Sequence, residues 1–578
     1  MVGGDAGKCR FASPMKIRLG TPISVTLIVA ALGIFLVWPM AHVFGRSFWD
    51  DRGFTLIYVA GLFTNSVQLQ AGLMSFLIAT CVTLCCVGVA LPMAWVFARR
   101  SFPGKALWSG LLLLPMILPP FVSAVGMKII FSRAGALSTL LMNLGIVDGP
   151  VDWLGHFPLF GIVLLETLHL FPILFLNLVA ALANIDPSLE ESALNLGASP
   201  MRVFRRVTMP LAMPGLFAGM TLVFIWSFTE LGTPLVFGLR RVLPVAIYDS
   251  VAEIGTNPSG YAMVTFVLVI SALGFWISKR LLSRHRSVAT LGRLSQARRE
   301  VPLSFRGSLL LYLLVGGVLF AAVLPQISVV LLSVSHRWFL TVLPEGFTLE
   351  FFGQALNSEL TRTALVNSLS FSLIATVLDL LLGFGIAWLC VRKKIWGSDW
   401  LDALAMLPLA VPGLVIAFGY MGCFSGSFPN TLLDPRMNPM ILLSVSYAIR
   451  RLPYMVRAAH AGLEQVSSTY EEAAANLGAT PFRVVWRITL PLISANLLAG
   501  AILCFSFSML EVSDSLILAQ SENFYPITKA IYALLESLEN GLNVAAALGV
   551  WAMALLGAGL LVAAALMGKR FGQMFKAG

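Results

Sequence analysis

The sequence reads EESALNLGASPMRVFRRVTMPL at residues 190–211 and EEAAANLGATPFRVVWRITLPL at residues 471–492. The two stretches are 281 residues apart and share 14 of 22 positions. Each has a run of helix-forming residues that stops at a glycine, Gly197 or Gly478, where a left-handed helix end is favoured. A Ser-Pro or Thr-Pro pair then begins a second helix. The pattern predicts a repeated helix–turn–helix segment.

The rest of the chain has the composition of a membrane protein. Of its 578 residues, 58% are hydrophobic and only 12% are charged, and the mean hydropathy is +0.86. Apolar runs of about 20 residues recur, and each is long enough to cross a bilayer as a helix. The net charge of +11 comes from basic residues that flank these runs, which indicates membrane orientation and not nucleic-acid binding.

We predict an all-α membrane protein with about twelve transmembrane helices in two parallel six-helix repeats. The predicted spans lie near residues 22–45, 66–98, 107–132, 157–183, 213–237, 258–278, 308–335, 365–391, 401–424, 438–462, 493–519 and 542–567. Because six is an even number, both repeats cross the membrane in the same direction, as in transporters with parallel repeats.

Other matched positions extend the repeat beyond the loop. The stretch LLPMILPPFVSAVGM matches MLPLAVPGLVIAFGY. The matched pairs are Pro115 with Pro408, Pro119 with Pro412, Gly126 with Gly419, and Asn65-Ser66 with Asn367-Ser368. The proline pairs are expected to break two related helices, either as a gate or as static kinks.

Charge then assigns the sides of the membrane. With the N-terminus inside, the predicted cytoplasmic segments hold 26 of the 39 basic residues, and both repeated loops lie inside. The first apolar run is interpreted as an uncleaved span. The predicted divisions are a cytoplasmic tail (1–21), a first half (22–278) with its loop (184–212), a basic linker (279–307), a second half (308–567) with its loop (464–492) and a cytoplasmic tail (568–578).

The repeated loop resembles a known motif. The spacing Glu-x-Ala, three residues, Gly and a final Leu-Pro is similar to the EAA loop of ABC importer permeases, which forms the coupling helix that docks on the ATPase subunit. The resemblance covers both halves. It implies ATPase-coupling roles for Glu190, Glu191, Ala193, Gly197, Arg202, Pro210, Glu471, Glu472, Ala474, Gly478, Arg483 and Pro491.

The resemblance also implies an overall function. The chain is expected to be a fused, two-copy permease of the bacterial inner membrane with both termini cytoplasmic, working by alternating access. Its implied partners are two copies of an ABC ATPase and a periplasmic or lipid-anchored substrate-binding protein. In its length the chain resembles the fused permeases of ferric-iron, thiamine and 2-aminoethylphosphonate importers. Ferric iron is the favoured cargo, because acidic residues lie near the predicted outer mouth and would attract a cation.

A different class, an ion-driven secondary transporter with 6+6 spans, remains an alternative. That class usually places its marked basic loop between the second and third spans of each half, whereas the marked loop here lies between the fourth and fifth. An enzyme is not indicated, since we find no catalytic constellation and no phosphate-binding loop. No cofactor or metal spacing is seen, so ATP is expected to be used by the partner ATPase alone.

Ionisable residues inside spans are costly and therefore candidates for the translocation path. Glu230 and Glu511 share the offset of 281 and are predicted about 25 Å above the cytoplasmic ends of their spans. They would attract a cation or hold a gate, or else be satisfied locally near the outer interface. Glu166 and Arg450 come from equivalent segments, which leaves open an ion pair between the halves, snorkelling or simple packing.

Overall fold

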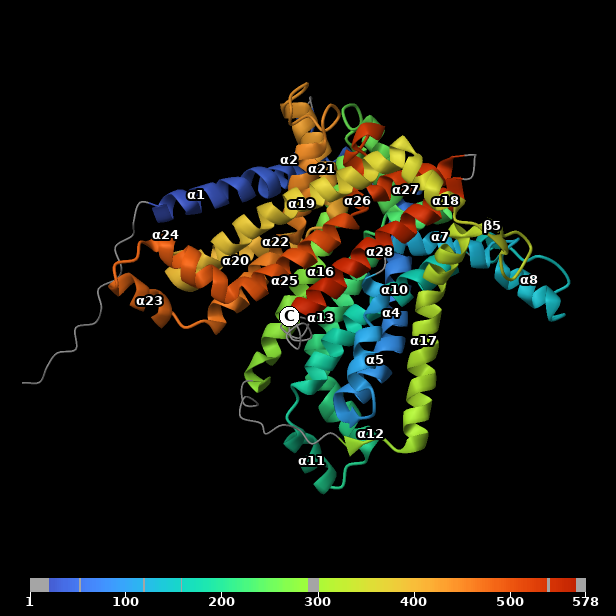
Figure 1. The fold of residues 1–578 in the computed structure, drawn as a ribbon, viewed down its shortest axis with the longest axis horizontal. Coiled ribbons are helices and arrows are strands. Elements are labelled where there is room, and N and C mark those ends of the chain that lie inside the picture. The colour runs from blue at the N-terminus through green and yellow to red at the C-terminus, as the bar shows by residue number, and fades with distance from the viewer. Residues whose placement is uncertain are drawn as a thin grey trace, which may run out of the picture.

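The computed structural model is almost wholly helical, and its two halves extend in different directions from a shared region (Figure 1). It describes residues 20–50, 53–117, 120–156, 158–289, 301–537 and 541–567. Residues 1–19 of the predicted N-terminal tail, the predicted C-terminal tail, residues 290–300 of the linker and Pro119 lie outside these residues. The all-α fold class is confirmed.

The first half contains the following elements. They are α1 (Gly20–Leu32), η1 (Gly33–Val37), α2 (Trp38–Phe48), α3 (Ile57–Thr64), α4 (Ser66–Arg99), α5 (Lys105–Leu111), α6 (Leu114–Ile117), α7 (Pro120–Phe131), α8 (Ala136–Asn143), α9 (Trp153–His156), α10 (Pro158–Ala183), α11 (Pro187–Asn195), α12 (Pro200–Val203), η2 (Phe204–Thr208), α13 (Met209–Phe228), α14 (Gly232–Phe237), α15 (Leu243–Asp249), η3 (Ser250–Glu253) and α16 (Ser259–Ala289).

The second half follows nearly the same order. Its elements are α17 (Phe305–Ser333), α18 (Glu350–Asn357), α19 (Glu359–Trp388), η5 (Leu389–Lys393), α20 (Ser398–Met406), η6 (Leu407–Leu409), α21 (Gly413–Ser427), α22 (Met440–Gln465), α23 (Thr469–Asn476), α24 (Pro481–Val484), η7 (Val485–Thr489), α25 (Leu490–Met509), α26 (Ser513–Leu518), η8 (Glu522–Phe524), α27 (Ile527–Glu536) and α28 (Gly541–Met567).

Short strands pair at three places along the described chain. The antiparallel pairs are β1 (Trp49–Asp50) with β2 (Gly53–Phe54), and β5 (Ser335–Arg337) with β6 (Glu345–Phe347). A parallel pair joins β3 (Arg100–Ser101) to β4 (Val301–Pro302), so the chain just before α17 is held against the first half.

Among the described residues, ten helices are long and apolar enough to cross a membrane, or eleven if the bent pair α20–η6 and α21 counts as one span. The remaining predicted span, 438–462, forms the 26-residue helix α22, which does not meet this criterion. It carries the charged residues Arg450, Arg451, Arg457 and Glu464, which lower its hydropathy.

Four predicted spans are shorter or more broken than expected. Residues 401–424 form two helical segments that meet at 98° around Pro412, and the first-half counterpart is divided among α5, α6 and α7. Residues 213–237 and 493–519 are interrupted after Phe228 and Met509, before the short helices α14 and α26. Helix α16 also continues to Ala289, into the segment predicted as linker.

The first helices of the two halves are exchanged. Helices α1 and α2 pack on α19 and α21 of the second half, and α17 packs on α7 and α10 of the first half. Gly126 allows the second contact, because a Cβ there would lie 1.9 Å from the carbonyl oxygen of Pro325 in α17. Its counterpart Gly419 faces Pro39 in α2. The two halves therefore clasp each other.

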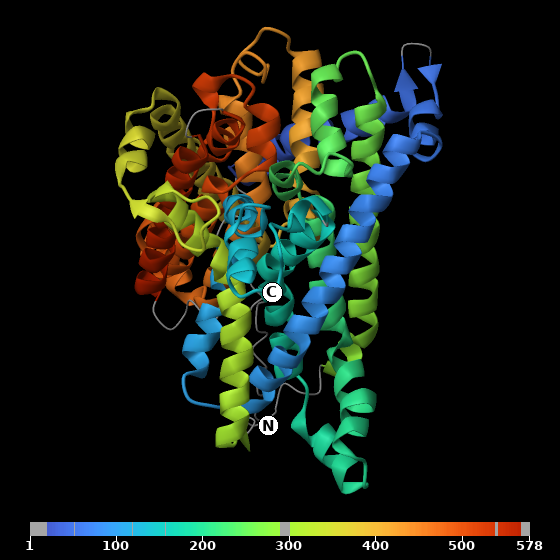
Figure 2. The ribbon, with the colours of Figure 1, turned by 90° about the vertical axis from the view of Figure 1, so that its right-hand side faces the viewer.

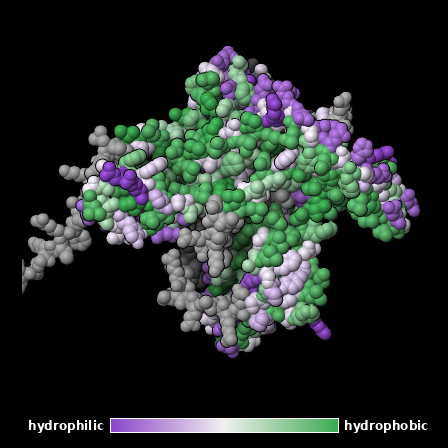
Figure 3. All heavy atoms as spheres, viewed as in Figure 1, coloured by the Kyte–Doolittle hydropathy of each residue, from purple (hydrophilic) through white to green (hydrophobic). Residues whose placement is uncertain are grey.

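The clasp holds together two arms that point apart. In Figure 1, α4, α10 and α13 lead down to α11, whereas α19, α22 and α25 lead left to α23. The same first-half arm runs vertically when the molecule is turned by 90° (Figure 2). The visible face is largely hydrophobic, with hydrophilic residues gathered toward its ends, as suits a membrane protein (Figure 3).

Candidate functional site

The repeated loop folds as predicted in both halves. Helix α11 ends at a left-handed turn at Gly197 (φ +82°), and α23 ends in the same way at Gly478 (φ +85°). Within the first turn, the Gly197 N–H donates to Leu194 O (2.9 Å) and the Ala198 N–H donates to Ala193 O (3.1 Å). This is a Schellman helix end, which explains why a glycine recurs at this position in both loops.

Two of the four loop helices, α11 in the first half and α24 in the second, have a side-chain hydrogen bond at their start. Asp186 caps α11, since its side chain accepts a hydrogen bond from the Ser188 N–H at 2.9 Å. That bond holds the pKa of the Asp186 carboxyl below its ordinary value. In the second half, Thr480 Oγ1 accepts from the Arg483 N–H at 3.4 Å. A π-helical turn, η2 or η7, then leads into the next span.

A largely buried ion pair ties each loop to the end of an earlier membrane segment of the same half, α4 in the first half and η5 after α19 in the second. Glu190 accepts from Arg99 at the end of α4 and from Thr208 Oγ1 (2.6 Å). In the second half, Glu471 accepts from Arg392 Nε at 3.0 Å and from Thr489 Oγ1 at 3.1 Å. We call each set of three residues a latch.

The latch was only half predicted. Sequence analysis selected both glutamates but assigned them to the ATPase contact, whereas the structure turns them toward their own half. The basic and hydroxyl partners were missed. Their signal was present, because Thr208 and Thr489 share the offset of 281, and Arg99 and Arg392 share the offset of 293 found for Pro115 and Pro408.

The other predicted loop residues face outward. Exposed positions are Glu191, Arg202, Pro210, Glu472, Arg483 and Pro491, whereas Ala193 and Ala474 are half-buried. Large apolar side chains are exposed beside them, above all Leu196 (88% exposed) and Leu477 (90% exposed). Such a surface at the tip of a short loop is suited to cover by another protein.

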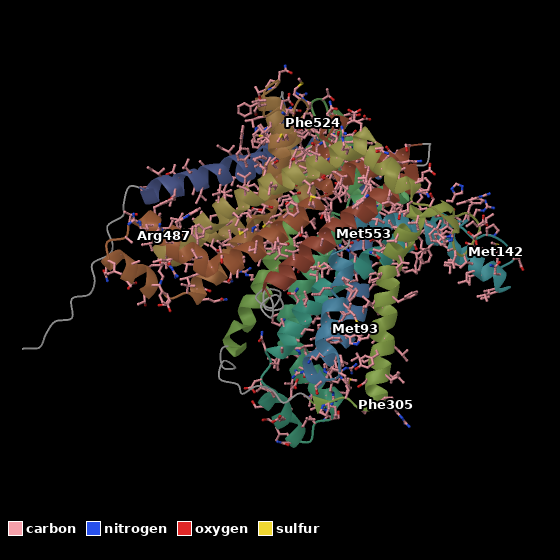
Figure 4. All side chains as sticks on the ribbon, viewed as in Figure 1. Met93, Met142, Phe305, Arg487, Phe524 and Met553 are labelled. Atoms are coloured by element: carbon pink, nitrogen blue, oxygen red, sulfur yellow. The ribbon has the colours of Figure 1, made fainter. Side chains whose placement is uncertain are left out.

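The two loop tips differ in chemistry. The second carries Phe482 and Trp486, whose rings stack with centroids 6.2 Å apart and planes 9° apart. The first has Met201 and Arg205 at these positions. Figure 4 labels Arg487, next to this aromatic pair, at the left end of the second arm and Phe524 at the top of the molecule.

A cavity of ≈ 200 Å³ lies where the two halves meet. Its walls come from α10, α22, and the helix breaks around Glu230 and Glu511, and it also reaches the proline-marked breaks at Pro120 and Pro412. The structure thus brings together all four predicted path residues, including Glu166 and Arg450. Unpaired backbone is tolerated at membrane depth beside such a cavity.

The two acids of the symmetric pair have different partners. Glu511 is buried (6% exposed) and forms ion pairs with both Arg450 and Arg451. Arg450 also lies 3.7 Å from Asp514, whose carboxylate accepts from Ser446 Oγ at 2.7 Å. The predicted option of an ion pair between Glu166 and Arg450 is wrong, because Arg450 is engaged by acids of its own half.

The described residues of the first-half wall include no arginine. Glu230 Oε1 accepts from the backbone N–H groups of Gly232 (3.1 Å) and Thr233 (3.3 Å). Glu166 accepts from Ser227 Oγ, and its other oxygen has no hydrogen-bond partner among the described residues. His169 Nδ1 lies 2.7 Å from the carbonyl oxygen of Pro115 and therefore donates to it.

Comparison with known proteins identifies the family. A model of the binding-protein-dependent transport system inner membrane component matches residues 88–287 and again residues 379–573. The chain therefore belongs to this family, with two copies of its domain fused. It is a multi-pass membrane permease, the transport subunit of its system.

Similar proteins support the same class. The ferric transport system permease protein of Actinobacillus pleuropneumoniae is 28% identical over 88% of this chain and 72% of its own length. A second Fe(3+)-transport system permease protein, from Haemophilus influenzae, is 25% identical over 87% of this chain and 90% of its own. The molybdenum transport system permease protein of the same organism is 30% identical over 37% of this chain and 95% of its own length.

Among the residues that the structure describes, no group of three or more His, Cys, Asp or Glu side chains is arranged to hold a metal ion. The ionisable groups of the cavity therefore do not form a closed metal-ligand cage within the described part of the chain.

Proposed function

We propose that the chain is the permease of an ABC importer that carries ferric iron across the bacterial inner membrane. The observation that carries the importer function is the pair of latched loops, each with an exposed apolar tip on a rigid turn. The ferric cargo rests on the names of the relatives and on the acids of the cavity.

The proposed partners follow from the two loops. Each loop docks on one ATPase subunit, so two copies are needed, and these subunits bind and hydrolyse all the ATP. A periplasmic or lipid-anchored binding protein delivers the cargo from outside. Both termini, the basic linker and both loops lie in the cytoplasm, and this chain binds no cofactor and no nucleic acid.

The loop residues divide into two roles in this proposal. Glu190 and Glu471 position the loops, whereas Glu191, Glu472, Arg202 and Arg483 contact the ATPase together with the apolar tips. Ala193, Ala474, Gly197 and Gly478 shape the turns, and Pro210 and Pro491 begin the spans that carry motion to the cavity. ATP-driven closure of the ATPases would then move one arm relative to the other.

Reconstitution in liposomes tests the proposal. The purified chain alone should hydrolyse no ATP above background, because hydrolysis is assigned to its partner. With the ATPase and an iron-loaded binding protein, ATP-dependent ferric uptake should appear. ATP hydrolysis by the pure chain, or uptake driven by an ion gradient without ATP, would favour the secondary-transporter alternative.

The turn at Gly478 offers a sharper test of coupling. A β-branched residue is strained at a positive φ by roughly 1–2 kcal/mol, so Gly478→Val should misdirect α24. The chain should still insert in the membrane, but the ATPase should co-purify poorly. Ala475→Val is the matched control, because it adds the same side chain within helix α23. Wild-type ATPase recovery with Gly478→Val would remove the loop from the coupling role.

Cargo is tested separately by competition. Uptake of radioactive ferric iron should resist excess thiamine, 2-aminoethylphosphonate and molybdate. If one of these compounds is transported in place of iron, the proposed cargo is wrong, but the chain is still the permease of an importer. The last of them is included because a molybdenum permease resembles part of the chain.

A further inference from the structure

The two walls of the cavity carry different charge although they descend from the same repeat. An offset of 281 pairs Glu230 with Glu511, Glu166 with Tyr447, His169 with Arg450, and Leu170 with Arg451. All of these except Tyr447 line the cavity. Both halves thus have a glutamate at the helix break, Glu230 or Glu511. The two arginines beside this glutamate, however, are present only in the second half.

The second wall is electrically balanced. Arg450 and Arg451 face the two carboxylates of Glu511 and Asp514. Asp514 Oδ1 has no hydrogen-bond partner among the described residues, but unlike the orphaned oxygen of Glu166 it has a cation beside it, Arg450 Nη1 at 3.7 Å. A further hydrogen bond holds Arg451 in place, since its guanidinium donates to Phe507 O at 3.1 Å. A buried arrangement with matched charges and fixed geometry has little tendency to release a carboxylate to a passing ion. This wall is therefore structural.

The acids of the first wall lack a cation in direct contact, although Arg450 of the opposite wall acts on Glu230 at longer range. The described residues place no Lys or Arg in hydrogen-bond or ion-pair contact with Glu166 or Glu230. Glu166 is only 2% exposed, yet its Oε1 has no partner within that part of the chain. A buried carboxylate oxygen without a partner is costly, and an arriving cation would remove that cost.

His169 completes the same wall as a neutral donor atom. Its Nδ1 carries the proton that is donated to Pro115, so in the neutral ring Nε2 keeps its lone pair. Residues 166 and 169 are three apart on α10 and so share a face. Carboxylate oxygens with one imidazole nitrogen form a donor set for a hard or borderline metal cation, not for an oxyanion.

We infer that the cation follows a one-sided path, with Glu230, Glu166 and His169 of the first half as its contacts and the second half as a neutral wall. The inference rests on the proposed importer function and deepens it. It also removes Glu511 and Arg450 from the cargo contacts, where the symmetry of the sequence had placed them.

Glutamine substitutions in the reconstituted importer test the path. Glu230→Gln and Glu166→Gln keep the shape of the side chain and remove its charge. Each should lower ferric uptake about tenfold at low cargo concentration, since a contact to a charged group is lost. Glu230→Asp, which retains the charge, should recover a substantial part of the uptake.

Two further measurements separate this role from a structural one. ATPase co-purification and hydrolysis stimulated by loaded binding protein should stay near wild type in both glutamine variants, because neither residue lies in a loop. Asp379→Asn is the matched control, since Asp379 is a buried acid of α19 that does not line the cavity. Its uptake should remain near wild type.

The outcomes are distinct. If the wild-type importer carries no ferric iron, the proposed cargo is wrong whatever the variants do. If it carries iron and both glutamine variants match its uptake, the one-sided path is wrong and the importer stands. If Asp379→Asn lowers uptake as much as they do, any intramembrane acid matters and the path is also rejected.

Discussion

The two halves of this permease agree at their loops and disagree at the cavity. Both loops have the same left-handed glycine turn and the same Glu–Arg–Thr latch. At the cavity, one half presents two arginines and the other presents a histidine and a leucine. The loop geometry is preserved between the two copies, as the proposed docking of each loop on an ATPase subunit requires, whereas the cavity walls have diverged, as the proposed one-sided path requires.

The largest loss of stability should follow substitution of Glu511, the acid of the neutral second-half wall. Glu511→Gln removes one partner of a buried network and leaves two arginines short of charge, which costs about 3–5 kcal/mol. Glu230→Gln should cost about 1 kcal/mol or less, because the amide oxygen can still accept from Gly232 and Thr233. Thermal unfolding of the detergent-purified chain compares them. Equal shifts would show that the two acids are equivalent after all.

A second difference concerns the clasp between the halves. Gly126→Ala places a methyl group 1.9 Å from a backbone oxygen of α17, so about 3 kcal/mol of stability should be lost. At Gly419 the nearest atoms are Met40 Cε at 3.2 Å and the Cβ and carbonyl oxygen of Pro39 at 3.3 Å, so a small shift of α2 would make room and alanine should cost about 1 kcal/mol. The same unfolding assay measures both. A larger loss at Gly419 would contradict the unequal closeness of the two contacts.

The latches should instead behave alike. Arg99→Gln and Arg392→Gln each leave a mostly buried glutamate without its cation, at a cost of about 2 kcal/mol. Each loop should then move independently of its span, so more ATP is hydrolysed per cargo transported. The charge exchange Arg392→Glu with Glu471→Arg should restore part of the coupling. If only one of the two substitutions uncouples ATP hydrolysis from transport, the two latches are not equivalent.

The loop was predictable because its signals are local. Helix-forming residues, a glycine that needs positive φ and a following Pro act within a few positions, so the turn at Gly478 could be read from sequence. Exposure followed from the same pattern. The latch needed the end of α4 or α19 to meet a loop about 80–90 residues later in the chain, and only the repeat hinted at it.

The sequence predicted which ionisable residues line the cavity, but it did not predict which of them contact each other. Repeat spacing selected Glu166, Glu230, Arg450 and Glu511, and the structure gathers them. Which side chain pairs with which depends on the rotation of packed helices, and spacing carries no such information. The helix breaks beside the acids were missed for a related reason, since the bond from Thr528 Oγ1 to the Glu511 carbonyl comes from another element.

One error in the repeat itself has a clear cause. Asn65-Ser66 was matched to Asn367-Ser368, but the structural counterpart of Ser368 is Ser75. Ser75 accepts from the Leu243 N–H at 2.8 Å, and Ser368 accepts from the Ile527 N–H at 2.7 Å. The offset is 293 before the fourth span and 281 from there to Glu230 and Glu511, because the first half has additional residues around α8 and α9, and it is 284 between Leu243 and Ile527. No single offset could align both regions.

The smallest predicted effect is a difference in ATPase affinity between substitutions in the two loop tips. Trp486 is 64% exposed and lies against Phe482, so an ATPase that covers the pair would bury a large aromatic surface. The first loop offers the exposed Arg205 at the equivalent position, whose flexible charged side chain contributes less at a partly wet rim.

Trp486→Ala should therefore weaken ATPase binding about tenfold, and Arg205→Ala about twofold to threefold. Titration of the ATPase onto the nanodisc-embedded chain measures both affinities. Trp49→Ala is the control, because it removes an exposed tryptophan outside the loops and should leave the affinity unchanged. Equal losses at positions 486 and 205 would mean that the turn and the latch set the ATPase contact, and that the aromatic pair adds no asymmetry between the halves.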